Sequence, residues 1–125
     1  MTMPKIRKLI PSEDQEQTAL VQWLEIQKIV FYAIPNGGFR NLLEAAKLKR
    51  CGVQSGVPDL CIPIPSGSYN GLYLELKKLT GKATENQLIW QALLRSNGYM
   101  SEIAKGFDEA KAIVLNYLKP MKPAA

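Results

Sequence analysis

The sequence contains no histidine and only two cysteines, Cys51 and Cys61. Without an imidazole base, the chain cannot carry a Ser-His-Asp or Cys-His mechanism. A zinc site on the two cysteines would need two further ligands, and no histidine is present to supply them. We therefore expect two free thiols in a reducing compartment. Any chemistry must come from groups other than imidazole.

Long apolar runs are also missing. No stretch of about 18 apolar residues occurs, so we expect neither a membrane span nor an export signal and place the protein in the cytoplasm. The 125 residues, 46% of them apolar, suit one domain with one core. The net charge of +5 favours an anionic partner, and nucleic acid is the commonest candidate.

Local signals predict a single domain built from alternating helices and strands. We expect helices at 12–27, 38–50, 84–97 and 108–118, and strands at 29–34, 59–64, 71–79 and 99–104. This order, α-β-α-β-β-α-β-α, predicts an α/β fold in which helices flank a mixed β-sheet. The domain would cover 12–119, between a basic arm at 1–11 and a short tail at 120–125.

Capping residues mark several of these boundaries. Ser12 opens the first helix with a capping box, Gly52 ends the second helix, and Asp108 is expected to cap the last one. The last helix carries an apolar stripe that includes Tyr117 and Leu118. We expect this stripe to supply a dimer surface.

Two charged residues stand in the strand expected at 71–79. Glu75 and Lys77 are two positions apart, so they point to the same face of that strand. Asp59 begins the preceding strand, and a hairpin between the two strands would bring Asp59 close to Glu75. Two carboxylates, the main-chain carbonyl of Leu76 and water form an oxygen site that suits Mg²⁺ or Mn²⁺.

Such a site, with Lys77 beside it to orient water or stabilise negative charge, predicts hydrolysis of phosphodiester bonds. The alternative is an ion pair between Glu75 and Lys77 on an exposed strand face, with Asp59 as an ordinary turn residue. The strongly apolar run around the pair, and the separate strand that follows Pro58, weaken this alternative without excluding it, because buried charges need partners.

Longer motifs connect these residues. The sequence reads GVPDL at 56–60, LELK at 74–77 and GKATENQ at 81–87, and PNGG at 35–38 precedes Arg40. Together with an acidic first helix, this pattern spans roughly residues 12–105. It resembles the VRR-NUC (virus-type replication-repair nuclease) family of the PD-(D/E)XK nuclease superfamily.

The resemblance implies a role for each site residue. Asp59 and Glu75 would bind the catalytic metal ion, Lys77 would be the catalytic lysine, and Gln87 would be the polar helix residue that faces the site. The sheet would be of the restriction-endonuclease-like type.

The resemblance also implies a metal ligand from the first helix. Glu16 is favoured for this position and Glu13 is the alternative. Stand-alone members of the family imply a Mg²⁺- or Mn²⁺-dependent, structure-selective endonuclease that acts on branched DNA such as Holliday junctions. They also imply a homodimer and a phage or prophage origin in a bacterial cell.

Basic residues near the expected site would contact DNA phosphates without reading the base sequence. These residues are Arg40, Lys47, Arg50, Lys78 and Lys82. For the helical ones, a solvated helix end that complements the helix dipole is the alternative. A non-catalytic nucleic-acid-binding module, or a subunit of a repair assembly on a nuclease fold, is the alternative function.

Overall fold

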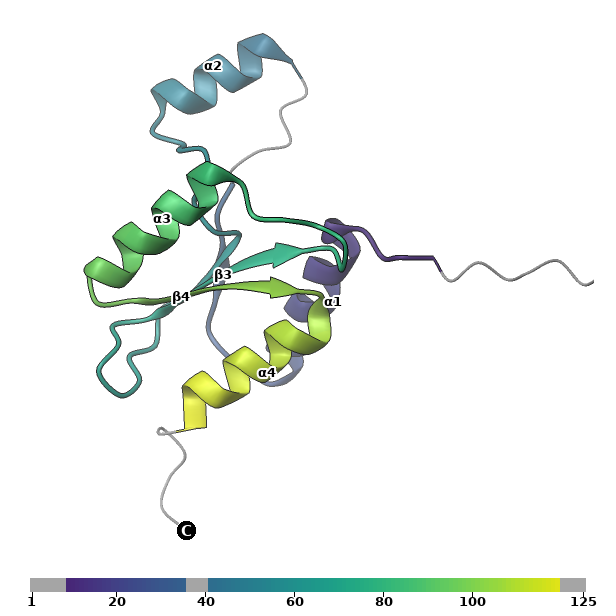
Figure 1. Ribbon diagram of the computed structural model, residues 1–125, viewed down its shortest axis with the longest axis vertical. Helices are drawn as coiled ribbons and strands as arrows, with labels where there is room; N and C mark the ends of the chain where they lie inside the picture. The colour runs from purple at the N-terminus through teal and green to yellow at the C-terminus, as the bar shows by residue number, and fades with distance from the viewer. Residues whose placement is uncertain (1–8, 36–40, 120–125) are drawn as a thin grey trace, which may run out of the picture.

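The computed structural model describes residues 9–35 and 41–119 (Figure 1). Its elements are α1 (Glu13–Ile26), β1 (Tyr32–Ala33), α2 (Leu42–Arg50), β2 (Leu60–Ile62), β3 (Leu72–Lys77), α3 (Glu85–Ser96), β4 (Met100–Lys105) and α4 (Phe107–Leu118). This is the predicted order. Most of the expected arm, at 1–8, and the expected tail at 120–125 lie outside the described residues. None of the helices in the described part is long and apolar enough to cross a membrane.

The described strands form one mixed sheet in the order β1-β2-β3-β4. β1, β2 and β3 are successive antiparallel neighbours, whereas β4 lies parallel to β3 after a crossover through α3. The predicted hairpin is confirmed, with Leu60 opposite Leu74. β2 is shorter than predicted because Pro63, which has no N–H, cannot extend the ladder. The edge strand β1 pairs with β2 at only two positions.

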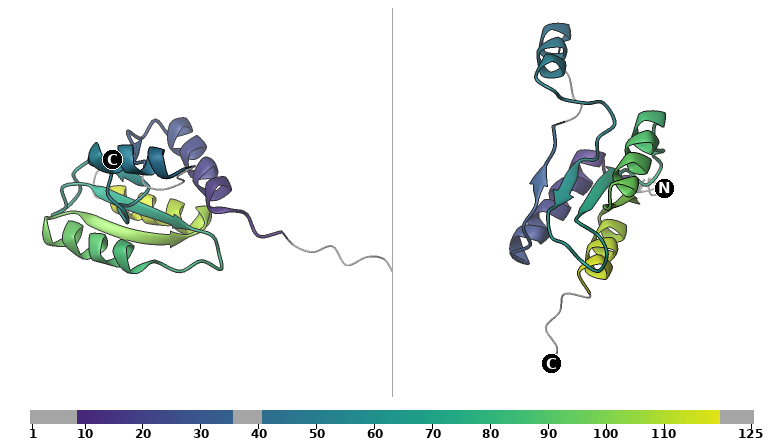
Figure 2. Two further views of the ribbon diagram at one scale, coloured as in Figure 1. Left: turned by 90° about the horizontal axis from the view of Figure 1, so that it is seen from above. Right: turned by 90° about the vertical axis from the view of Figure 1, so that its left-hand side faces the viewer.

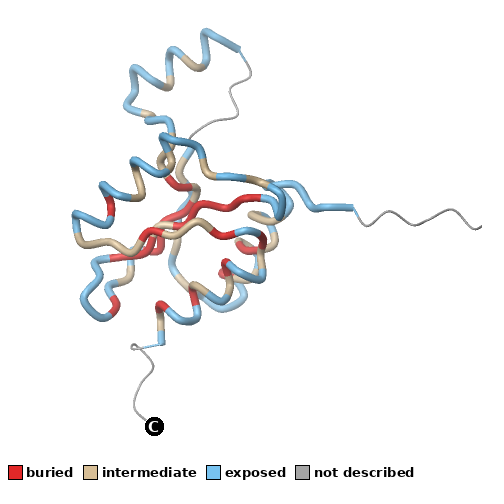
Figure 3. The backbone as a smooth tube through the Cα atoms, viewed as in Figure 1, coloured by how far each residue is buried: buried red, intermediate tan, exposed pale blue. Residues whose placement is uncertain are grey.

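The core lies between the sheet and two helices. Leu72, Leu74 and Leu76 alternate along β3 and are fully buried, together with Leu20 and Leu24 of α1. α1 and α4 cover this apolar face, whereas α3 lies along β4 on the other side of the sheet (Figure 2). The buried segments concentrate in β2 and β3 (Figure 3). Each fully buried leucine contributes about 1.5–3 kcal/mol to folding.

The apolar stripe of α4 faces this core, so the prediction that it supplies a dimer surface is wrong. Tyr117 is only 3% exposed, and Leu118 packs against the buried cluster. The Tyr117 hydroxyl donates a hydrogen bond to the Ile64 carbonyl at 2.6 Å, and the Ser66 hydroxyl donates to the Tyr117 carbonyl. These bonds tie the loop between β2 and β3 to the end of α4.

The start of α4 also differs from the prediction. Asp108 does not cap the helix, because the N-cap residue is Gly106, which has no side chain to accept a bond. Instead, Glu16 of α1 supplies the acceptor: its Oε2 lies 3.2 Å from the Phe107 amide nitrogen. Gly106 has φ 88°, and a Cβ there would come within 2.5 Å of the same oxygen. A glycine is therefore required where α1 meets the start of α4.

α2 is the element that stands apart from the rest (Figures 1 and 3). It begins later than predicted, because the Asn41 side chain caps it by accepting from the Glu44 amide at 2.7 Å. Gly52 follows its last turn at φ 98°, and the amides of Gly52 and Val53 bond back to the helix as in a Schellman motif. The predicted glycine stop is therefore confirmed.

We predict that Glu16→Ala destabilises the protein by about 1 kcal/mol, because the Phe107 amide loses its acceptor. For a domain of this size, thermal unfolding should shift down by roughly 4 °C. Asp108→Ala removes an exposed carboxylate from the same helix end without removing a cap bond, and it serves as the matched control. Equal losses for the two variants would contradict the assignment of Glu16 as the cap.

Candidate active site

The register of β3 places the two predicted charges on the face opposite the leucines. Glu75 and Lys77 alternate with Leu74 and Leu76, and their exposed fractions are only 3% and 6%. This burial excludes the alternative of an ion pair on an exposed strand face. A buried carboxyl and a buried amine are costly unless a partner or a function accounts for them.

Asp59 lies beside Glu75, as the hairpin predicts. Asp59 immediately precedes β2, and its main-chain carbonyl accepts a hydrogen bond from the Ile34 amide at 2.8 Å. Its Oδ2 accepts from the Leu76 amide at 2.8 Å, so the carboxylate crosses to the neighbouring strand. A side-chain hydrogen bond between Asp59 and Glu75 completes the contact. The structure therefore joins residues that are sixteen positions apart in the chain into one carboxyl pair.

Burial and this pair change the acidity of Glu75. Burial first, then the hydrogen bond and negative charge of Asp59, raise the pKa of Glu75 to about 9, while Lys77 acts in the opposite direction. Among the buried side-chain atoms of the described residues, Glu75 Oε1 has no hydrogen-bond partner. An orphaned carboxyl oxygen beside a second carboxylate is the environment expected where a cation belongs.

The donor set fits a hard divalent ion with an incomplete protein shell. Within the described residues, no three acidic or thiol side chains converge on one point that would hold a metal ion. Mg²⁺ commonly takes one or two carboxylates and completes its shell with water and substrate phosphate. Asp59, Glu75 and the carbonyl of Leu76 are therefore groups that could hold such an ion.

The first helix brings Glu13, the alternative ligand of the sequence analysis, next to Lys77. Glu13 Oε1 lies 4.0 Å from Lys77 Nζ, and the charge of Glu13 adds to the raised pKa of Glu75. Glu16 points to the start of α4, where it accepts from Phe107. The two residues are separated by less than one turn, so the way α1 docks decides which of them reaches the site.

Gln87 also differs from its predicted role. The side-chain Oε1 of Gln87 accepts from the backbone amide of Thr84 at 2.8 Å, while the backbone amide of Gln87 donates to the Thr84 hydroxyl at 3.2 Å. These two bonds form a capping box at the start of α3. The side chain is turned back on its own helix because it accepts from the otherwise unsatisfied Thr84 amide. Its observed role is therefore structural.

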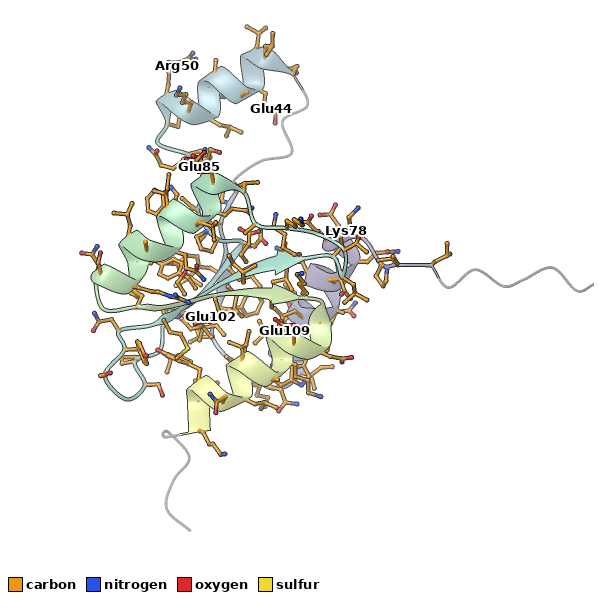
Figure 4. The ribbon with its side chains drawn as sticks, viewed as in Figure 1. Glu44, Arg50, Lys78, Glu85, Glu102 and Glu109 are labelled. Carbon is orange, nitrogen blue, oxygen red and sulfur yellow. The ribbon has the colours of Figure 1, made fainter. Side chains whose placement is uncertain are left out.

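The predicted DNA-binding residues that the structure describes lie on two segments, the loop after β3 and the last turn of α2. Lys78 and Lys82 are exposed in the loop between β3 and α3, and Lys78 follows directly on the strand that carries Glu75 (Figure 4). Lys47 and Arg50 are exposed in the last turn of α2. Arg40 lies outside the described residues.

The contact between the connector before Asp59 and the start of α3 could hardly be predicted from the sequence. Gly56 has φ 92°, and a Cβ there would lie 2.6–2.7 Å from atoms of Asn86. The Asn86 side chain also donates to the Ser55 hydroxyl at 3.3 Å. These contacts fix the connector before Asp59 against the first turn of α3. The glycine of GVPDL is visible in the sequence, but its partner is not.

Comparison with known proteins agrees with this geometry. The family model described as VRR-NUC domain matches residues 11–108. The chain belongs to the VRR-NUC domain family. A solved structure described as a VRR_NUC domain protein is 34% identical, with a TM-score of 0.77 over 89% of this chain and 91% of that chain. A search of curated proteins found no match.

Membership of the VRR-NUC family gives the site its general meaning. A VRR-NUC domain is a nuclease-type domain, so DNA is its expected substrate class and a divalent metal its expected cofactor. Asp59 and Glu75, with the paired strands β2 and β3, lie inside the matched region. The resemblance read from the sequence, and the mixed sheet flanked by helices, are confirmed.

We predict that the metal-free protein loses stability as the pH rises from 4.5 to about 9. The pKa of Glu75 lies above its usual 4.5 in the folded state. The folded protein therefore holds a proton that the unfolded chain has released, and the resulting stability disappears as the pH rises through the folded value. Glu75→Gln cannot titrate and should flatten this dependence. Thermal unfolding in EDTA measures both, and parallel pH profiles would contradict the assignment.

Proposed function

We propose that this protein is a Mg²⁺- or Mn²⁺-dependent, structure-selective DNA endonuclease that hydrolyses phosphodiester bonds of branched DNA, such as Holliday junctions. The observation that carries the proposal is the buried carboxyl pair of Asp59 and Glu75, with its orphaned oxygen and Lys77 on the same strand face. The resemblance also supports a phage- or prophage-encoded protein that acts in the cytoplasm of a bacterial host.

Each group of the site has a distinct task in this reaction. Asp59, Glu75 and the Leu76 carbonyl would hold the ion, which supplies Lewis-acid stabilisation of the phosphate. The bond from the Leu76 amide to Asp59 holds that carboxylate in place before any ligand arrives. The Lys77 amine, buried beside Glu75, orients the attacking water and stabilises the negative charge that develops on the phosphate.

Glu13 is the first-helix acid that we assign to the site. It is half exposed and faces Lys77, so it restrains the lysine and approaches the same region as Glu75. Glu16 has a different task at the start of α4. The two glutamates therefore separate catalysis from stability within a single turn of α1.

The cations near the site would hold the DNA backbone. Lys78 and Lys82 follow β3, so they are suited to the phosphates next to the scissile bond. Lys47 and Arg50 would contact phosphates farther away, from α2. Contacts of this kind give affinity without sequence preference, as an enzyme selective for DNA shape requires.

We also propose that a second copy packs on the outer face of α3. Leu88, Ile89 and Leu93 are each about half exposed there. Leu88 and Leu93 lie at equal distances from the midpoint of the helix, so antiparallel pairing of two copies brings Leu88 of one against Leu93 of the other. The same pairing brings Glu85 near Arg95 of the second copy, with opposite charges. Such a dimer would present two sites to a junction.

We predict that Asp59→Ala, Glu75→Ala and Lys77→Ala each reduce DNA cleavage at least about a hundredfold while DNA binding is retained. Labelled linear, nicked, flap and four-way DNA would be tested with Mg²⁺ or Mn²⁺. Glu109→Ala and Lys119→Ala remove exposed charges on and after α4, and they are the matched controls. Cleavage that persists in EDTA, or an active Lys77→Ala variant, would refute the proposal.

The glutamates of α1 give a second comparison in the same assay. Glu13→Ala should reduce cleavage with little change in thermal stability, because the side chain is half exposed and caps nothing. A variant with normal cleavage would remove Glu13 from the site.

We predict that Leu88→Asp or Leu93→Asp converts the protein to a monomer, because a carboxylate would be buried without a partner in the α3 interface. Sedimentation at micromolar concentration measures the change. Leu115→Asp places the same charge at a half-exposed leucine of α4 and should leave the dimer intact. A wild-type protein that sediments only as a monomer would exclude the interface.

A further inference from the structure

α2 is a helix without a packing partner in the described part of the chain. No other described helix or strand packs against it, and none of its residues is buried. A hollow of about 520 Å³, lined by Ala45, Ala46, Ile89 and Trp90 among others, separates α2 from the first turns of α3. Figure 1 and the right-hand view of Figure 2 show the helix held away from the sheet.

Local signals alone do not account for such a helix. α2 has nine residues, whereas isolated helices shorter than about 12–15 residues are marginal in water. The Asn41 cap, the Schellman motif at Gly52 and the charges near both ends favour the helical state. Most helical stability nevertheless comes from packing of an apolar face. We therefore expect a bound molecule to supply the packing that stabilises α2.

The composition of α2 indicates what that molecule is. Leu42 and Leu43, in its first turn, are 89% and 84% exposed, and they are the two most exposed leucines of the described helices. The charged residues of the helix are Glu44, Lys47, Lys49 and Arg50. This excess of positive charge would repel a second α2 across a symmetric interface and attracts a polyanion. Arg50 and Glu44 mark the two ends of the helix in Figure 4.

The connection to the active site sets α2 within reach of the same substrate. The connector from α2 to Asp59 runs through Ser55 and Gly56, and both contact Asn86 of α3. α2 is thus attached through a fixed point that lies three residues before Asp59 in the chain, and its basic end is the end that leads into this connector.

We propose that Leu42 and Leu43 form a wedge that inserts between unstacked bases of DNA at a branch point, while Lys47, Lys49 and Arg50 contact the adjoining phosphates. Apolar side chains inserted at a base step make proteins prefer DNA that is already unstacked, because the cost of opening the step is smaller there. The inference rests on the proposed function for its substrate and explains how the domain would select branched over continuous duplex.

The test measures base unstacking in the absence of cleavage. Four-way and linear DNA carry 2-aminopurine at the branch point or at the matched duplex position, in EDTA, with the full-length chain. Wild-type protein should increase the fluorescence of the branched DNA. Leu42→Ala with Leu43→Ala should abolish this increase and reduce the preference for branched over linear DNA about tenfold, a difference of about 1.4 kcal/mol. Both leucines are exposed and alanine favours helix, so the variant should fold.

Two controls distinguish a wedge from a general apolar contact and from a dimer surface. Leu115→Ala, a half-exposed leucine of α4, should leave the fluorescence and the preference unchanged. An unchanged signal in the Leu42/Leu43 variant would overturn the wedge. Loss of a dimer in that variant by sedimentation would also overturn it, because a second copy would then be the occupant of α2. The fluorescence test needs no cleavage. A negative result in the nuclease assays would therefore not decide whether the wedge exists.

Discussion

The site exists because β2 pairs with β3 in one particular register. Leu60 lies opposite Leu74, and this register places Asp59 at the position where its carboxylate reaches the Leu76 amide and the Glu75 carboxyl. A shift by one residue would exchange the two faces of β3 and put its leucines where the charges are. The apolar core therefore enforces the register of the candidate site, because only one of the two faces of β3 carries Leu72, Leu74 and Leu76 and can be buried against the helices.

The same arrangement carries an energetic conflict. A buried carboxyl with an unpartnered oxygen, held against a second carboxylate, is unfavourable for folding, and the protonation of Glu75 reduces the conflict only in part. The surrounding packing tolerates it: β3 is a central strand of the sheet, covered by α1 and α4 on one face. Strain of this kind persists where the rest of a fold determines the backbone, and it marks sites that bind a charged ligand.

The periphery is organised by a different principle. α3 and α2 expose leucines that a monomer in water has no reason to display, while the leucines of α1 and β3 are buried. Exposed apolar residues of this number point to surfaces that are covered in the working state. The separation of the proposed dimer face on α3 from the proposed DNA-contacting end of α2 would let one symmetric assembly hold two strands of a junction at once.

Much of this protein follows from the order of its residues alone: the succession of elements, the helix starts with their own capping side chains, the hairpin, and the set of Asp59, Glu75 and Lys77. These features depend on periodicity and on neighbours near in the chain. Contacts between distant elements set everything that depends on how the helices dock. These contacts make Glu16, rather than Asp108, the residue that caps the start of α4. They also place Glu13 against Lys77 and bury Tyr117. A rotation of one helix about its axis changes each of these contacts, and no local pattern records that rotation.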